Sequence, residues 1–264
     1  MPPAKTISWP TAARSPQLAA NEVHVWAAPL DVSAALRKRL AATLSADERE
    51  RADKFKIENL RQRFVTGRGA LRDVLGRCLQ CDPAELEFIQ GWRGKPALAP
   101  KFTDRGIHFN LAHSAELALI AVTRAGPVGV DVERIRPVKD ADELVARFFS
   151  PRESDSFQQL AAGAKPEAFF RLWTRKEAFL KATGEGLARA LDAVEVSFLP
   201  GEPARVIALA GDAPAAARWS LHALAPAPGF VGAVAIEVEK IEVRCWKWEA
   251  RQPGGAGRKF GRTI

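Results

Sequence analysis

Hydrophobic positions along the chain follow two spacings, and these predict two successive groups of strands and helices. Stretches with a spacing of two predict β-strands, and apolar residues three and four apart predict amphipathic helices. The first group comprises a strand at 22–26, helices at about 46–57 and 59–79, and strands near 85–89 and 107–122. The second comprises a strand at 128–133, helices at about 142–148, 151–162 and 165–183, strands near 193–199, 205–209, 218–224 and 231–238, and an extended stretch at 241–248.

Residues 63–76 and 171–184 form a short internal repeat, in which Arg, Thr, Ala and Gly coincide at four positions. Upstream of each copy stands a Ser-x-x-Glu capping box, which begins at Ser45 in the first case and at Ser150 in the second. A capping box marks the start of a helix. We therefore expect a duplicated α/β unit whose halves meet at the turn-forming stretch 124–127.

The two copies of the repeat differ in their charged positions. Gly69 and Asp73 of the first copy stand opposite Glu177 and Lys181 of the second. Only the second half therefore has this carboxylate–ammonium pair, which lies on one helix face at i and i+4. Because ligand sites are common at domain interfaces, we expect an asymmetric site between the halves.

Composition and charge narrow the class of protein. Of 264 residues 47% are hydrophobic, and the formal charge is +8 at pH 7, half of it from four basic residues in 251–264. No apolar run approaches membrane-spanning length and no secretory signal is present, so we expect a cytoplasmic protein without membrane contact. Cys78 and Cys81 have no second pair nearby and predict reduced thiols, not zinc. The basic surplus fits nucleic acid, a polyanionic cofactor or an acidic protein partner equally well.

The candidate chemistry lies in two segments. Residues 129–133 read Gly-Val-Asp-Val-Glu and place Asp131 and Glu133 on one face of a strand. With Glu177 and Lys181 from the later helix, three carboxylates and an ammonium can converge, and three hard oxygen donors suit Mg²⁺. Each segment alone also has a structural reading, as the solvated face of a strand or an ordinary helix ion pair.

Taken together, the two segments resemble a known family signature. Residues 129–133, followed by 173–187 with the pattern Trp-x-x-Lys-Glu-x-x-x-Lys-Ala-x-Gly-x-Gly-Leu, resemble 4′-phosphopantetheinyl transferases of the surfactin-synthetase-activating type. The resemblance implies an α+β fold of two similar α/β subdomains, related by a pseudo-two-fold axis, with coenzyme A in the cleft between them. It also implies a monomeric, Mg²⁺-dependent enzyme that moves 4′-phosphopantetheine to a serine of an apo acyl- or peptidyl-carrier protein and releases 3′,5′-ADP.

We accordingly divide the chain into four parts. Residues 1–20 are expected to form a flexible extension and 249–264 a basic disordered tail. Residues 21–125, the first half, would hold the nucleotide end of coenzyme A. Residues 126–248, the second half, would carry the Mg²⁺ and phosphate site.

The resemblance extends to the binding of coenzyme A. Lys95 and Pro96 belong to a Gly-Lys-Pro element that meets the adenine end in this family, although a plain turn would read the same. Residues 109–114 resemble the family's Asn-x-Ser-His-Ser segment, which implies phosphate contacts from His113 and Ser114. Ala112 stands where the family often has Ser, so one hydroxyl contact is missing, and Ser114 on the same face would replace it only in part.

Basic residues of the first half are the candidates for the 3′-phosphate of coenzyme A. Arg51 and Arg63 resemble, by position, the residues that hold this group, and the planar guanidinium can pair with phosphate through two hydrogen bonds. The stretch is crowded with charge, so a solvated helix face is the alternative for both.

The resemblance also assigns catalytic roles. Asp131, Glu133 and Glu177 would hold Mg²⁺ against the pyrophosphate, which Asp131 and Lys181 would also contact, and Lys181 and His113 would offset charge developing there. The general base stays open: Glu177, directly or through a metal-bound water, or Glu153, whose place in a capping box gives it an equally good structural role.

Two other functions remain as alternatives. One is a different Mg²⁺-dependent enzyme acting on phosphoanhydrides, which would be expected to carry a Walker loop or a Gly-x-Gly-x-x-Gly loop that this sequence lacks. The other is a basic module that binds nucleic acid. The seven tryptophans are scattered and the chain has no tyrosine, which disfavours the aromatic platform of such a module.

Overall fold

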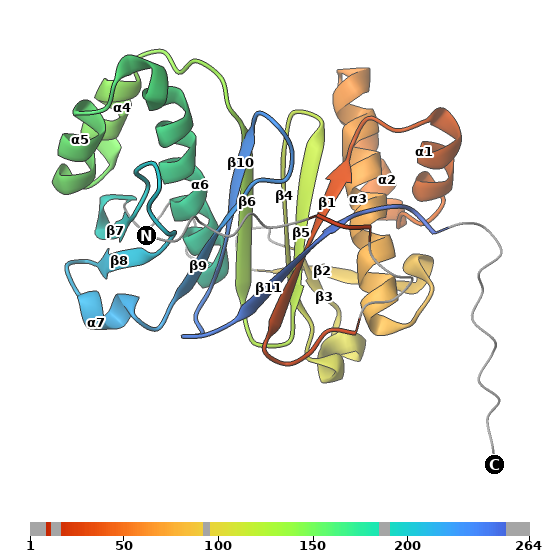
Figure 1. Cartoon of the computed structure of the whole chain (residues 1–264). Helices are drawn as coiled ribbons and strands as arrows, with labels where there is room; N and C mark the ends of the chain where they lie inside the picture. The colour runs from red at the N-terminus through yellow and green to blue at the C-terminus, as the bar shows by residue number, and fades with distance from the viewer. Residues whose placement is uncertain (1–8, 12–16, 92–95, 185–190, 252–264) are drawn as a thin grey trace.

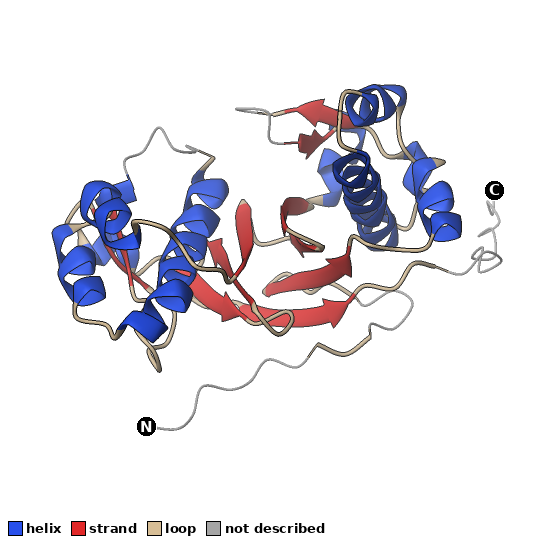
Figure 2. Ribbon diagram, turned by 90° about the horizontal axis from the view of Figure 1, so that it is seen from above, coloured by secondary structure: helices blue, strands red, loops and turns tan. Residues whose placement is uncertain are grey.

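The computed structural model describes residues 9–11, 17–91, 96–184 and 191–251. It is an α+β fold in which helices gather at two ends and strands lie between them (Figures 1 and 2). The first half contains β1 (Glu22–Pro29), α1 (Ala34–Ala41), α2 (Ala46–Asp53), α3 (Glu58–Leu79), β2 (Phe88–Gln90), β3 (Pro96–Leu98), β4 (His108–Ser114) and β5 (Leu117–Thr123). The second contains β6 (Val128–Arg134), α4 (Ala141–Phe148), α5 (Pro151–Gln158), α6 (Lys165–Thr183), β7 (Val194–Val196), β8 (Val206–Leu209), α7 (Ala213–Ala216), β9 (Ser220–Leu224), β10 (Phe230–Ile236) and β11 (Glu242–Lys247).

The two halves share a strand order. The first sheet runs β11-β1-β5-β4 and the second β6-β10-β9, with β2-β3 and β7-β8 as small separate pairs. Within β1-β5-β4 and within β6-β10-β9 all neighbours are antiparallel. Each half thus repeats one succession, a strand, helices, a small strand pair and two further sheet strands.

Matching ion pairs accompany this shared order. Both capping boxes form, so Glu48 and Glu153 accept hydrogen bonds from the backbone of Ser45 and Ser150. The second oxygen of Glu48 lies 3.0 Å from Nε of Arg68, and a Glu153 oxygen lies 2.6 Å from Nζ of Lys176. In the repeat of 63–76 and 171–184, position 68 stands opposite position 176. The similarity therefore includes the contact between the second and third helices of each half, which are α2 with α3 and α5 with α6.

Several expected boundaries are wrong. The stretch 107–122 is a hairpin and not one strand, because the chain turns at Ala115, which adopts a left-handed φ of 49° without any Gly or Pro to mark the turn. Helix α2 ends at Asp53 and α5 at Gln158, earlier than the apolar spacing indicated. Helix α1 was not predicted, since Leu40 is its one buried residue, and β3 and α7 are too short to leave a pattern.

Strand β11 joins the sheet of the first half, although the sequence division grouped it with the second. It pairs in parallel with β1, and the buried Trp248 that follows donates from its indole nitrogen to Asp73 of α3 at 2.9 Å. Thr11 in turn bridges to Lys247, and Trp9 packs against the core. Residues 9–11 thus lie beside β11.

Three clusters of buried side chains hold the molecule together. One lies between α3 and the first sheet and one between α6 and the second sheet. The third is shared by the two sheets. Strands β4 and β6 run side by side at the junction (Figure 1), where Asn110 accepts a hydrogen bond from the backbone N–H of Val130.

Candidate functional site

A glycine brings α6 against β6. A Cβ added at Gly129 would lie 1.9 Å from the carbonyl oxygen of Ala178 and 2.5 Å from the backbone nitrogen of Ala182, so only glycine fits there. The close approach puts Lys181 of α6 next to Asp131 of β6, with 2.6 Å between Nζ and Oδ1. Two residues far apart in sequence meet here as expected.

Asp131 is a buried carboxylate. Its side chain is almost fully buried, and burial raises its pKa to about 6; Lys181 counteracts this, while Glu177 and Glu133 add to it. Its second oxygen, Oδ2, is buried and has no hydrogen-bond partner among the described residues. A buried oxygen without a partner is costly unless another group supplies one.

The other two carboxylates surround Asp131. Glu133 accepts a hydrogen bond of 2.7 Å from the Ser114 hydroxyl and one of 3.2 Å from Arg136. Burial raises the pKa of the half-buried Glu177, Lys181 lowers it, and the charge of Glu133 raises it further. The three carboxylates thus lie within electrostatic range, but no three acidic, His or Cys side chains of the described ranges are close enough to form a ready-made metal cluster.

His113 comes to this group from β4 of the first half. Although His113 is exposed, the surrounding protein atoms and then the charge of Lys181 lower its pKa, which favours the neutral imidazole at pH 7. Ser114, the next residue, contacts Glu133 and also accepts from the backbone N–H of Arg134 at 3.2 Å. Ala112 lies in the core shared by the two sheets.

The basic candidates of the first half lie elsewhere. Arg63 makes a two-pronged contact with Asp31, with distances of 2.8 and 2.7 Å. The Arg51 guanidinium stacks over Phe64 at 5.5 Å. Beside it is Arg68, which the sequence reasoning missed: burial lowers its pKa, and one of its guanidinium nitrogens is buried with no partner among the described residues. The sequence could have pointed to Arg68, because it stands opposite Lys176 in the internal repeat.

Of the two residues expected to meet the adenine end of coenzyme A, Lys95 and Pro96, only Pro96 lies among the described residues. Lys95 lies outside the described residues. Pro96 begins β3 and lines a small pocket of about 200 Å³ together with His108, Val128 and Gly184. That pocket therefore has walls from both halves.

Glu153 is held inside the second half. Its carboxylate accepts from the backbone nitrogens of Ser150 and Val196 at 3.0 and 2.9 Å, and it pairs with Lys176. Burial raises the pKa of Glu153, against the lowering effect of Lys176. These contacts support its structural reading.

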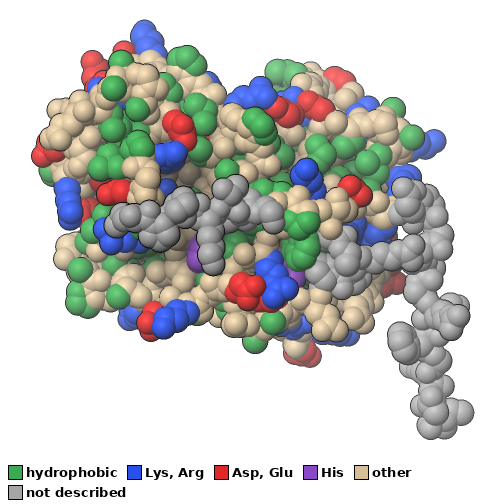
Figure 3. Space-filling view, in the orientation of Figure 1, with side chains coloured by type: hydrophobic (Ala, Val, Ile, Leu, Met, Phe, Trp, Pro, Cys, Tyr) green, Lys and Arg blue, Asp and Glu red, His purple; other side chains and the backbone are tan. Residues whose placement is uncertain are grey.

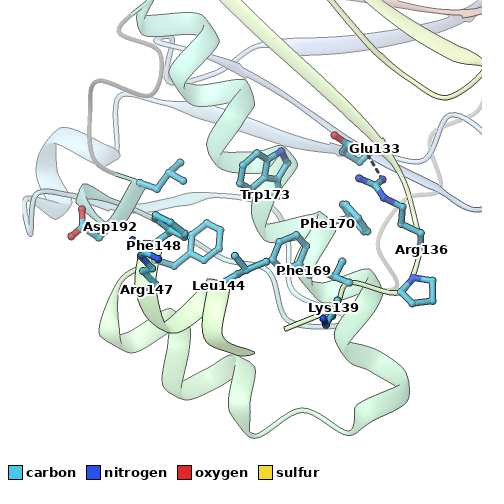
Figure 4. Close-up of a pocket in the computed structure, with 14 residues that line it drawn as sticks. Glu133, Arg136, Lys139, Leu144, Arg147, Phe148, Phe169, Phe170, Trp173 and Asp192 are labelled. Atoms are coloured by element: carbon cyan, nitrogen blue, oxygen red, sulfur yellow. Dashed lines mark hydrogen bonds and ion pairs between the residues drawn. The ribbon is translucent and has the colours of Figure 1, made fainter. Parts of the chain in front are cut away.

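A large apolar pocket adjoins Glu133, and the sequence did not predict it. It has a volume of about 790 Å³, and Phe169, Phe170 and Trp173 of α6 line it (Figure 4). Figure 4 shows Glu133 and Arg136 at one end and Arg147 and Asp192 at the other. The aromatic residues one to two helical turns before Glu177 are the part of this pocket that the sequence could have indicated. The other walls come from α4 and from loops, and the sequence does not show that these lie next to α6.

The outer surface adds two observations. In Figure 3 the upper edge of the molecule is notched between the two groups of helices, and acidic and basic side chains are mixed over the visible face. Within the described ranges, no helix is long and apolar enough to cross a membrane.

Comparison with known proteins gives consistent matches along the chain. The sequence model described as "4′-phosphopantetheinyl transferase superfamily" matches residues 127–235, and that described as "4′-phosphopantetheinyl transferase, N-terminal" matches 33–125. The 4′-phosphopantetheinyl transferase HetI of Nostoc sp. is 43% identical over 231 residues, covering 88% of this chain and 94% of HetI. The 4′-phosphopantetheinyl transferase Sfp of Bacillus subtilis is 30% identical over 159 residues, covering 60% and 68%. A solved apo-ACPS structure from Chronobacterium ammoiniagenes is 21% identical, covers 41% of this chain and 92% of that one, and has a TM-score of 0.30, too low to establish a common fold.

Proposed function

Because this chain belongs to the 4′-phosphopantetheinyl transferase superfamily, we propose that it transfers the 4′-phosphopantetheine group of coenzyme A to a serine of an apo acyl- or peptidyl-carrier protein. It is an enzyme of the transferase class. The serine hydroxyl attacks the pantetheine-side phosphorus of coenzyme A, and 3′,5′-ADP leaves. The observation that best supports this function is the ion pair between Lys181 and Asp131. Glu133, Glu177 and His113 are near enough to this pair to interact with it electrostatically.

The site would lie between two halves related by a pseudo-two-fold axis. The shared strand order and the matching pairs Glu48–Arg68 and Glu153–Lys176 support this relation. The pocket around Pro96 and Val128 supports a cleft whose walls come from both halves. Coenzyme A would span that cleft, with its nucleotide on residues 21–125 and its pyrophosphate on residues 126–248.

The oxygen donors at this site suit Mg²⁺ in chemical type, although among the described residues they are not gathered into a metal cluster. Oδ2 of Asp131 is buried without a partner among the described residues, and Glu133 and Glu177 supply hard oxygen donors nearby. Asp131, Glu133 and Glu177 would hold the ion. When bound, it would supply positive charge to the pyrophosphate oxygens, which lowers the barrier to phosphoryl transfer.

The remaining side chains would bind, orient and move the proton. Lys181 and the neutral His113 would donate to the pyrophosphate oxygens as charge develops there. Glu177 is our candidate for the base, because the contacts of Glu153 are all inside the fold. Arg63, Arg51 and the neighbouring Arg68 are candidates for the 3′-phosphate.

The alternatives gain little support. A nucleic-acid module would present a basic surface, whereas acidic and basic side chains mix on the visible face (Figure 3). A different phosphoanhydride enzyme would explain the carboxylates, but not the match over both halves.

The test is a mass measurement. The purified chain, Mg²⁺ and coenzyme A should raise the mass of an apo carrier protein by one phosphopantetheine, and a carrier with its serine changed to alanine should stay unmodified. Asp131→Asn keeps the side-chain shape and should lower turnover at least about 100-fold with little loss of stability. No transfer to acyl-, peptidyl- or aryl-carrier proteins by the folded chain would refute the proposal.

A further inference from the structure

Asn110 joins the two halves one residue away from Asp131. It lies on β4, 5% exposed, and its side-chain oxygen accepts a hydrogen bond of 2.9 Å from the backbone nitrogen of Val130 on β6. No backbone ladder joins β4 to β6 within the described strands. The amide oxygen thus stands where a neighbouring strand's carbonyl would stand in a parallel sheet. It gives a buried N–H a neutral partner, which such a group needs.

A second contact lies four residues further along both strands. There the Ser114 hydroxyl accepts from the backbone nitrogen of Arg134 at 3.2 Å and donates to Glu133. The two contacts enclose the segment of β6 that carries Asp131 and Glu133. Asn110 is therefore the attachment at one end of this segment, and it shares its strand with His113.

We propose that Asn110 is a positioning residue for phosphopantetheine transfer. Its bond to Val130 sets the register of β4 against β6, and so the distance between His113 of one half and the carboxylates of the other. The inference rests on the proposed function in that this junction would be the place of reaction. Misplacement of reacting groups by about 1 Å can cost about 100-fold in rate, so a small slip of β4 would matter.

The test compares three variants. Asn110→Leu keeps the size of the side chain but removes the acceptor, Asn110→Asp keeps an oxygen in the same place, and Asn59→Leu makes the first change at an exposed position of α3. Amide exchange of Val130, turnover at saturating substrates and Mg²⁺, and the melting temperature are measured for each. We expect Asn110→Leu to speed Val130 exchange at least about tenfold and to lower kcat per folded molecule about 10- to 100-fold.

The melting temperature of Asn110→Leu should fall by only a few degrees, which leaves the protein folded for the assay. Asn110→Asp should keep Val130 protected, and Asn59→Leu should change neither exchange nor kcat. Faster exchange with kcat within about twofold of the parent would show a purely structural contact and overturn the inference. So would unchanged Val130 protection in Asn110→Leu. If the unchanged protein modifies no carrier, the proposed function fails instead, and exchange still reports whether Asn110 holds β6.

Discussion

At position 129 a glycine lets the backbone of α6 come to lie against β6, and Lys181 reaches Asp131 as a result. The sequence predicted that Asp131, Glu133, Glu177 and Lys181 would converge, because strand and helix spacings put each pair on one face. It did not predict that Ser114 would bind Glu133 or that Arg63 would pair with Asp31. Such contacts depend on how separate strands and loops are placed, which no local spacing encodes.

Changing Gly129 to Ala should disable the site. The new Cβ would meet backbone atoms of α6 at 1.9 and 2.5 Å, so the helix must move, and overpacking of this kind costs about 3 kcal/mol or more. We expect a large drop in the free energy of unfolding, measured by denaturant titration, and loss of transfer. Gly163→Ala, where a Cβ meets nothing within 4 Å, is the matched control and should be neutral. Normal activity in Gly129→Ala would show that α6 can shift without cost.

Arg63→Ala should weaken the binding of coenzyme A but not of 3′-dephospho-coenzyme A. A charged hydrogen bond to phosphate contributes roughly 1.5–3 kcal/mol, which corresponds to about 10- to 100-fold in Kd. Binding of both compounds is measured by calorimetry. Arg61→Ala is the control and should change neither, because Arg61 is an exposed residue of the same helix α3 and pairs with Asp53 at the end of α2. An equal loss for both compounds in Arg63→Ala would remove Arg63 from the 3′-phosphate.

Among the elements, the long helices and the isolated strands were predictable and the junctions between them were not. The capping boxes placed the starts of α2 and α5, and the apolar spacing found α3 and α6. The turn at Ala115 was not predicted, because alanine is not a residue type that marks a turn. The pairing of β11 with β1 was not predicted either. An alternating apolar pattern indicates that a segment is extended, but it does not indicate which strand the segment pairs with. The 790 Å³ pocket, built from α4, α6 and a loop, is hidden for the same reason.

Trp248 should stabilise the first half of the molecule more than the second half. Removing its buried side chain in Trp248→Ala costs about 3–5 kcal/mol and frees the buried Asp73 from its indole partner. Trp248→Phe should cost less, because most of the packing remains. Denaturant titration measures both, and amide exchange should show the loosening in β1, the neighbour of β11. The exposed Lys247→Ala should be neutral, and a loss confined to β9 and β10 would contradict the packing described here.

For the whole molecule, the two halves share a strand order but differ in sequence at the positions of Glu177 and Lys181. Gly69 shows the divergence: a Cβ there would lie 2.5 Å from Cβ of Leu40, so α1 occupies the position that Glu177 fills in the second half. The repeat predicted that difference in residue type. It could not predict that a helix takes the space.

Salt should weaken the binding of an acidic carrier protein more than the binding of coenzyme A. The chain carries a formal charge of +8, so an acidic carrier protein would be attracted over a longer range than that of the short-range contacts proposed for coenzyme A. Raising the ionic strength at constant Mg²⁺ should therefore raise the KM for an acidic carrier more than the Kd for coenzyme A. Steady-state kinetics and calorimetry measure the two. An equal response of both would assign carrier recognition to short-range contacts.

The parallel pairing of β11 with β1 also bears on how the protein is made. Strand β1 begins at Glu22 and its partner at Glu242, so a ribosome must add 220 residues, the difference of the two numbers, between them. At about 5–20 residues per second this takes roughly 10–40 s. During that time one edge of β1 is bare, and the indole that covers Asp73 does not yet exist. The half that is synthesised first is thus completed last, and until then its unpaired strand edge can be bound by chaperones or by another chain.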